Sequence, residues 1–211
     1  MGATVGVEIQ TDPNTVFQLF PSTYLTAGYQ ESYNLTGSDT LGGTHTGSYF
    51  VQTQSQTTFN GDPAIPLSLL LEWTNTQTNT FISIPATDYF STSLGDMRYV
   101  GFVQDTTVVS ATTSQIPQTG KIGDFGNVGT YTFNDSSQDV VTWRLTDGQN
   151  GRAYLVISTT SNDQSGNLDS SDEVKYLLAQ DGTRLALTFR AYLPSEPVTI
   201  TLSGNNILSG P

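Results

Sequence analysis

One stretch, Pro117–Leu193, constrains the fold more than any other, because polar and apolar residues alternate along it between paired turn residues. In the run DVVTWRLTD, Val141, Trp143 and Leu145 would share one side of an extended strand, and Arg144 would lie on the other. We therefore expect Trp143 to be a core residue. Three pairs of Asp or Asn with Gly interrupt the stretch and are typical of turns between antiparallel strands. We expect the following pairs in hairpin connections, with glycine at positive φ: Asp147-Gly148, Asn150-Gly151 and Asp181-Gly182.

The rest of the chain shows the same pattern of short alternating runs between turns. It predicts strands near Thr4–Gln10, Tyr29–Thr36, Ser48–Thr58, Ile65–Thr74, Phe81–Ser91, Arg98–Gln104, Gly129–Phe133, Val140–Thr146, Ala153–Thr160, Glu173–Ala179, Arg184–Leu193 and Val198–Ser203. About a dozen short strands without strand–helix alternation predict an all-β fold. The antiparallel strands would form a sandwich, a barrel or a strongly curved meander, with at most one short helix.

The domain prediction follows from length and composition. A chain of 211 residues is expected to form a single all-β domain over residues 1–211. Residues 105–120 are mostly small and polar. We expect a crossover there that joins two sub-sheets, 30–104 and 121–203.

The N-terminal region holds the one helix-like start in the sequence. Asp12 would cap a helix that begins at Pro13, and Pro21 would end it after barely two turns. A 3₁₀ turn or one short helix is the expected outcome. The apolar side chains of this region are expected to plug one end of a sheet rather than to line a site; they are Phe17, Leu19, Phe20 and Tyr24.

Charge excludes one class of partner. The net charge is −12, from 7 basic and 19 acidic residues, so nucleic acid would be repelled and an anionic membrane surface is disfavoured. Charged residues make up only 12% of the chain, which is typical of an exported, surface-exposed protein. The absence of cysteine excludes disulfides and thiolate chemistry. No apolar run reaches membrane-spanning length.

The first residues suggest an artificial start. Met1-Gly2-Ala3 carries no visible signal peptide. Our hypothesis is that an export signal was removed before Ala3, with a lipid anchor on a cysteine outside this sequence.

Three stretches carry a resemblance: YQESYNLTGSDTLGGTHTGSY, TTFNGDPAIP, and IPQTGKIGDFGNVGTYTFND followed by TWRLTD. Together they resemble exported, often lipoprotein-like, β-rich domains of proteobacteria that have no assigned activity. The resemblance implies an antiparallel β fold and a periplasmic, outer-membrane-associated or extracellular location. It implies no site residues.

His45 and Glu72 are the residues considered for catalysis. His45 is the single histidine, which a Ser-His-Asp triad would need, but it lies in a Gly/Thr-rich stretch without a nucleophile elbow. We expect a solvent-facing turn histidine. One histidine and no cysteine also leave zinc without a ligand set. Glu72, inside LLLEW, would act as a general acid if its pKa were raised. We expect instead a cross-strand ion pair with an arginine, and Arg144 is the first guess.

The segment from Ser161 to Glu173 is the one candidate for a metal. With Gly166 at the sixth place of a calcium loop, Asp163 and Ser165 take the third and fifth places and Asp172 the twelfth. Asp169 is a further oxygen donor. Ser161 stands where the first aspartate should be, and the flanks read as strands, so we expect a polar hairpin loop. The sequence predicts no cofactor.

Aromatic residues leave a binding role open. Tyr49, Trp73, Trp143, Tyr154 and Tyr176 would form a sugar-stacking platform if they were exposed, but their alternation favours packing. We predict a non-catalytic, envelope-associated or secreted bacterial domain that binds a ligand, a lipid or a partner. The first alternative is a carbohydrate-binding or adhesive module, and the second is a carboxylate-dependent hydrolase. A lipid carrier would show an apolar cavity inside a curved sheet.

Overall fold

The computed structural model describes residues 9–93, 98–104 and 107–208. These residues form no α-helix and fifteen β-strands. In chain order the strands are β1 (Val16–Gln18), β2 (Gln30–Asp39), β3 (Thr44–Thr53), β4 (Thr57–Phe59), β5 (Asp62–Asn75), β6 (Phe81–Ser91), β7 (Arg98–Gln104), β8 (Thr107–Gln115), β9 (Thr119–Lys121), β10 (Phe125–Thr132), β11 (Gln138–Gln149), β12 (Arg152–Asn162), β13 (Leu168–Leu178), β14 (Arg184–Leu193) and β15 (Val198–Asn205). No helix in the described ranges is long and apolar enough to cross a membrane.

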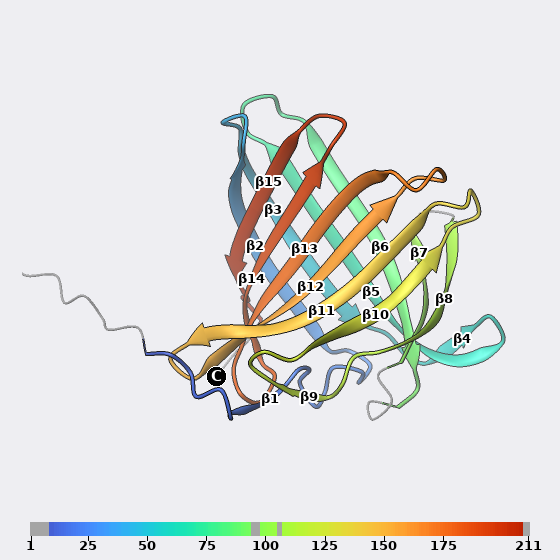
Figure 1. The fold of residues 1–211 in the computed structure, drawn as a ribbon, viewed down its shortest axis with the longest axis vertical. Coiled ribbons are helices and arrows are strands. Elements are labelled where there is room, and N and C mark those ends of the chain that lie inside the picture. Colours follow the sequence, from blue (N-terminus) through green and yellow to red (C-terminus); the bar gives the residue numbers. More distant parts are fainter. Residues whose placement is uncertain (1–8, 94–97, 105–106, 209–211) are drawn as a thin grey trace, which may run out of the picture.

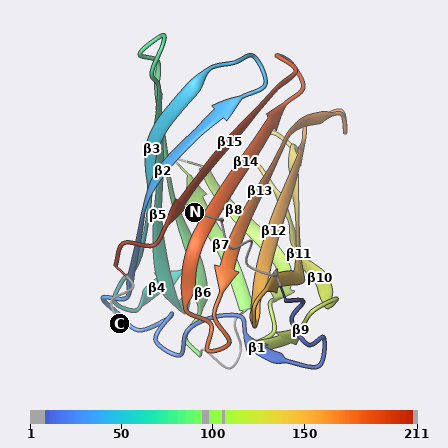
Figure 2. The same cartoon turned by 90° about the vertical axis from the view of Figure 1, so that its left-hand side faces the viewer.

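Thirteen strands form one antiparallel sheet that closes on itself. The order is β3-β2-β15-β14-β13-β12-β11-β10-β8-β7-β6-β5-β4, and an additional β3–β5 pairing joins the two sides. Because β4 is only a short addition at the edge of β5, twelve strands make up the ring. Figures 1 and 2 show the resulting barrel, with long tilted strands around a central space. The predicted all-β, antiparallel fold is confirmed, and of the three arrangements considered the barrel is the one formed.

Closure depends on a close approach of β3 and β5. Gly47 pairs with Trp73, and a Cβ atom at residue 47 would overlap the carbonyl oxygen of Glu72. Glycine is therefore required where the two strands meet, because any side chain on that side would push them apart.

The predicted crossover at residues 105–120 is wrong. Residues 107–115 form β8, which pairs with β7 and β10 inside the sheet, so no boundary between two sub-sheets lies there. The run TVVSATTSQ is polar, but it is rich in Thr and Val, whose branched side chains favour extended backbone. The polar composition of residues 105–120 did not exclude a strand, because a strand in a barrel needs apolar side chains on only one of its faces.

Of the two outcomes predicted at Pro13, a turn forms and a helix does not. Asp12 does cap a turn, since its Oδ1 accepts the N–H of Asn14 at 2.8 Å, but the chain then enters the short strand β1, which pairs with β9. The N–H of Gln18 donates to the carbonyl of Gln180 at 2.9 Å, so beyond the turn the backbone bonds to other parts of the chain and not in a helical pattern. The predicted opening strand Thr4–Gln10 lies mostly outside the described residues, and Ile9 and Gln10 are not in a strand.

The N-terminal segment closes one end of the barrel, which we call the plugged end. β1 and β9 lie beneath the strands in both views (Figures 1 and 2). The predicted plug residues are all at most 5% exposed: Phe17, Leu19, Phe20 and Tyr24. They belong to the same hydrophobic cluster as Trp143, which is 6% exposed, so the predictions of buried plug residues and of a core tryptophan are confirmed. Phe20 and Tyr24 also line the cavity described below, so the expectation that the plug residues would not line a site is wrong for these two. We call the opposite end, which carries the hairpins between β10 and β11 and between β12 and β13, the loop end.

Two of the three predicted turn glycines have positive φ. Gly182 has φ 85° and Gly151 has φ 75°, and Asn150-Gly151 forms the two-residue loop between β11 and β12. Gly148 lies instead within β11, beside an irregularity in the register, and does not take positive φ. The neighbouring Gln149 does, with φ 62°.

Candidate ligand-binding cavity

A cavity of about 890 Å³ occupies the barrel interior. Phe20, Tyr24 and Arg184 lie at its plugged end, and Ser137 and Asn162 mark its extent toward the loop end. Protein interiors are normally packed to the density of organic crystals, with few voids larger than a water molecule. The space is therefore a feature of the fold and not a packing defect.

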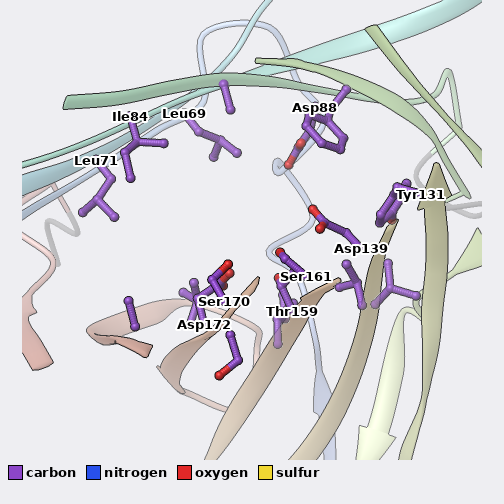
Figure 3. A pocket seen from close by; sticks show the side chains of 18 of the residues that line it. Leu69, Leu71, Ile84, Asp88, Tyr131, Asp139, Thr159, Ser161, Ser170 and Asp172 are labelled. Atoms are coloured by element: carbon purple, nitrogen blue, oxygen red, sulfur yellow. The ribbon is translucent and has the colours of Figure 1, made fainter. Parts of the chain in front are cut away.

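One wall of the cavity is aliphatic. Leu69 and Leu71 from β5 and Ile84 and Ala86 from β6 line it, and Figure 3 shows Leu69, Leu71 and Ile84 together on one side. Along β6 the inward positions alternate with outward ones, as expected for a strand. Leu69, Ile84 and Ala86 point inward yet remain half-buried, because nothing in the barrel fills the space before them.

The other wall is polar and comes from β11, β12 and β13. The register places Asp139 beside Ser161, which in turn pairs with Ser170. One inward position deeper, Thr159 pairs with Asp172. Figure 3 shows these side chains directed into the cavity. Hydroxyl and carboxyl groups therefore cover two consecutive levels of this wall.

Asp88 on β6 is the third inward carboxyl. Tyr99 Oη donates to Asp88 Oδ1 at 2.6 Å. Burial raises the pKa of Asp88 to about 6, although the bond from Tyr99 opposes the rise. Figure 3 shows the Asp88 carboxyl entering the same space as Asp139.

The carboxyls of the polar wall are perturbed for the same reason. Burial raises the pKa of Asp172 to about 6; a hydrogen bond with Thr159 opposes this shift, and the charge of Asp139 adds to it. Burial also raises the pKa of Asp139, opposed by a bond with Ser161 and reinforced by the charge of Asp169. These carboxyls are desolvated, and no described cation contributes to the shifts of their pKa values.

A buried ion pair lies at the plugged end of the cavity. Arg184 Nη1 donates to Glu31 Oε1 at 3.2 Å and to Oε2 at 3.3 Å, and both side chains are at most 1% exposed. Tyr29 and Tyr33 also donate to this carboxylate, at 2.6 Å and 3.0 Å. Three rings pack against the guanidinium, those of Phe20, Tyr24 and Tyr176. Glu31 is thus the ion-pair partner of the one basic group in the cavity's described lining, and the buried Nε of Arg184 has no hydrogen-bond partner among the described residues.

His45 is not the solvent-facing turn residue we expected. It lies in β3, is 4% exposed, and its Nε2 bonds to Asp39 Oδ2 at 2.8 Å. Its Nδ1 is buried and has no hydrogen-bond partner among the described residues, so no serine completes a triad. The expectation was wrong because the Gly/Thr-rich sequence around His45 is the start of a strand.

Glu72 and Arg144 do not meet. Glu72 accepts a hydrogen bond from Ser83 Oγ at 3.1 Å, while Arg144 pairs with Glu173 at 2.6 Å on the outer face. The predicted Arg144–Glu72 pair is therefore wrong, because β5 and β11 lie on different parts of the ring. Glu72 is absent from the cavity lining.

The calcium candidates lie in the turn between β12 and β13 and along β13, and the three aspartates among them all line the cavity. Asp163 Oδ1 accepts the N–H groups of Ser165 and Asn167, at 2.8 Å and 2.9 Å, and so holds the hairpin between β12 and β13. Asp169 and Asp172 belong to β13 and line the cavity. Among the described residues no three His, Cys, Asp or Glu side chains are grouped so that they could hold a metal ion.

The aromatic candidates mostly face inward. Trp73, Trp143, Tyr49 and Tyr176 are at most 9% exposed, and three of them line the cavity. Tyr154 is half-buried beneath Lys175, whose Nζ lies 3.8 Å from the ring centroid. These five residues form no exposed row on the outer face.

Models of protein families, curated proteins and solved structures gave no match. The structural features of the cavity are therefore the basis for inferring function.

Sequence reasoning missed two of the three inward carboxyls. Asp172 was considered only as a calcium ligand, and Asp88 and Asp139 were not considered. A signal was present for Asp88, because FISIPATDYF places it at the same spacing as Ile84 and Phe90, on the apolar side of the strand. An acid at an inward position is rare enough to mark a site.

Proposed function

We propose that this protein is a non-catalytic binding protein that holds a small, largely apolar molecule inside the barrel. The observation that carries the proposal is the unfilled interior of about 890 Å³, lined by half-buried aliphatic side chains and aromatic rings. Small-molecule sites typically have volumes of about 300–1,000 Å³ and combine an apolar lining with a few polar groups. The barrel interior has the size and the composition of such a site.

We further propose an envelope-associated or secreted location in a bacterium. The low share of charged residues supports this, together with the resemblance to exported β-rich domains. In that location the occupant would be a lipid or another amphipathic compound of the cell envelope. Mass spectrometry of small molecules that co-purify from the native host would identify it.

The binding role can be tested with N-phenyl-1-naphthylamine, a neutral apolar dye whose emission rises on leaving water. The protein should bind the dye, and Trp73 in the cavity should transfer excitation to it. Ala191→Trp adds bulk to the cavity lining and should abolish dye binding. Ala186→Trp on the same strand is the matched control, because Ala186 alternates with the buried, inward Leu187. Unchanged binding in Ala191→Trp would refute the proposed site.

One observation favours the hydrolase alternative. Asp88 and Asp172 share one cavity and have pKa values of about 6, a property that suits a general acid. A screen with chromogenic glycosides and esters distinguishes the roles. Turnover that is lost in both Asp88→Asn and Asp172→Asn would establish a hydrolase, whereas dye binding without turnover supports the binding role.

A further inference from the structure

We infer that the cavity selects amphiphilic cations, ligands that join an apolar body to an ammonium or similar cationic group. The inference rests on the proposed binding function and specifies which class of ligand the same cavity takes.

The first argument is the division of the cavity into two chemically different walls. β5 and β12 are six strands apart in either direction around the ring of twelve, so their inward faces oppose each other. β5 contributes Leu69 and Leu71, whereas β12 contributes Thr159 and Ser161. Figure 3 shows the aliphatic and the polar side chains across the same space. A ligand with one apolar and one polar side fits both walls at once.

The second argument is charge. Six described carboxyls line the cavity: Asp88, Asp135, Asp139, Asp163, Asp169 and Asp172. The single basic side chain in the described lining, Arg184, is already bound by Glu31 and covered by aromatic rings. A ligand anion would enter a field of uncompensated negative charge, and a cation would relieve it.

The third argument is the kind of contacts the polar wall offers. Carboxylates, when ionised, act only as hydrogen-bond acceptors, and the hydroxyls of Ser161, Ser170 and Thr159 also supply acceptor oxygens. An ammonium group brings several N–H donors and a positive charge, so it satisfies such a wall better than a neutral alcohol does.

The same geometry makes binding depend on pH. Below about pH 6, Asp88 and Asp172 gain protons and lose the charge that would attract a cation. The titratable or charged groups around these two carboxyls are Tyr99, Tyr131, Asp139, Asp169, Tyr176 and Arg184. Of these, Asp139 and Asp169 are further acidic groups, and the pKa values of Tyr99 and Tyr176 are raised above the ordinary value, so these two hydroxyls stay neutral in this range. Cation binding should therefore weaken as pH falls from about 8 to about 5.

Calorimetry with three probes that share one alkyl chain tests the inference: decylammonium, 1-decanol and decyl sulfate, each below its micellar concentration. At about pH 8 decylammonium should bind at least about tenfold more tightly than 1-decanol, and decyl sulfate should bind more weakly than either. At about pH 5 the advantage of decylammonium over 1-decanol should shrink several-fold.

Three variants locate the effect. Asp88→Asn and Asp172→Asn should each reduce the preference for decylammonium several-fold at about pH 8, and 1-decanol should bind at least as well as before. Asp62→Asn is the matched control, because it removes the same charge from an exposed position outside the cavity. It should leave the preference unchanged.

The outcomes separate the inference from the proposed function. If none of the three probes binds, both are overturned. If 1-decanol binds but decylammonium binds no better, or if decyl sulfate binds best, only the inference about cations fails. The inference about cations also fails, while the proposed function stands, if Asp62→Asn changes the preference for decylammonium as much as the two cavity variants do.

Discussion

Removing the carboxylate of Glu31 should destabilise the barrel by about 3–5 kcal/mol, because one partner of a buried ion pair would be left uncompensated. Glu31 is 0% and Arg184 1% exposed, so water would not screen the remaining guanidinium. Tyr29 and Tyr33 would also lose the acceptor of their hydroxyl groups. Arg184 has no other acidic partner in the described lining close enough for an ion pair. The loss is a large part of the roughly 5–15 kcal/mol that stabilises a typical domain.

The assay is urea unfolding of Glu31→Gln, Arg184→Leu and the double variant. With a slope of about 1–3 kcal/mol per M, a loss of about 3–5 kcal/mol in Glu31→Gln should lower the urea midpoint by about 1–5 M. The double variant should cost about 1–3 kcal/mol less than the sum of the single variants, because it removes both charges together. Additive losses, or a loss below about 1 kcal/mol for Glu31→Gln, would refute the view that this ion pair stabilises the plugged end.

Three further predictions concern other parts of the chain. Trp143→Ala should lower the free energy of unfolding by about 3–5 kcal/mol, because it leaves a cavity in the core. Arg144→Ala should lower it by less than about 1 kcal/mol, because the Arg144 side chain is 47% exposed. Urea unfolding of the two variants measures both losses. Gly182→Val should cost more than about 1 kcal/mol, since φ is 85° and a Cβ there would lie 2.6 Å from the carbonyl carbon of Phe20; Gly166→Val, at positive φ with open space around it, is the control and should lose less. Asp88→Asn should stabilise the protein at about pH 8 but not at about pH 4. The folded-state pKa of about 6 lies above the ordinary 3.8, so the wild-type carboxyl favours folding when protonated, and this contribution is lost as pH rises through 6. Thermal melts of both proteins across this range measure the difference, and a constant difference at all pH values would contradict the assigned burial.

The sequence predicted local features well because each depends on residues a few positions apart. The strands Phe81–Ser91, Arg98–Gln104 and Arg184–Leu193 have the same bounds in the structure as in the prediction. Alternation alone placed Trp143 inside, and the chemistry of Asn150-Gly151 predicted its hairpin turn. The errors arose where composition was used in place of pattern, as in the polar strand β8 and the strand that carries His45.

The candidate site was harder to predict because it joins residues from strands that are far apart around the ring. Asp88 comes from β6 and Asp139 from β11, and only ring closure turns both toward the same space. Alternation shows that Asp88 lies on the inner face of its strand, but it does not show which residues lie opposite. Desolvation of these carboxyls, which raises their pKa values, also depends on the whole barrel around them.

By itself the sequence determined most of the antiparallel strands, most of their turns and the buried side of strands such as the one that carries Trp143, because backbone geometry and side-chain alternation are local properties. The tertiary structure decided how many strands close the ring, that β3 meets β5, and that the interior remains open above the plug. Those outcomes depend on pairing between distant segments and on the balance of side-chain volume against barrel diameter. Alternation along a single strand determines neither the pairing of distant segments nor the volume left inside the barrel. The cavity and its carboxyls could therefore be identified only from the closed sheet.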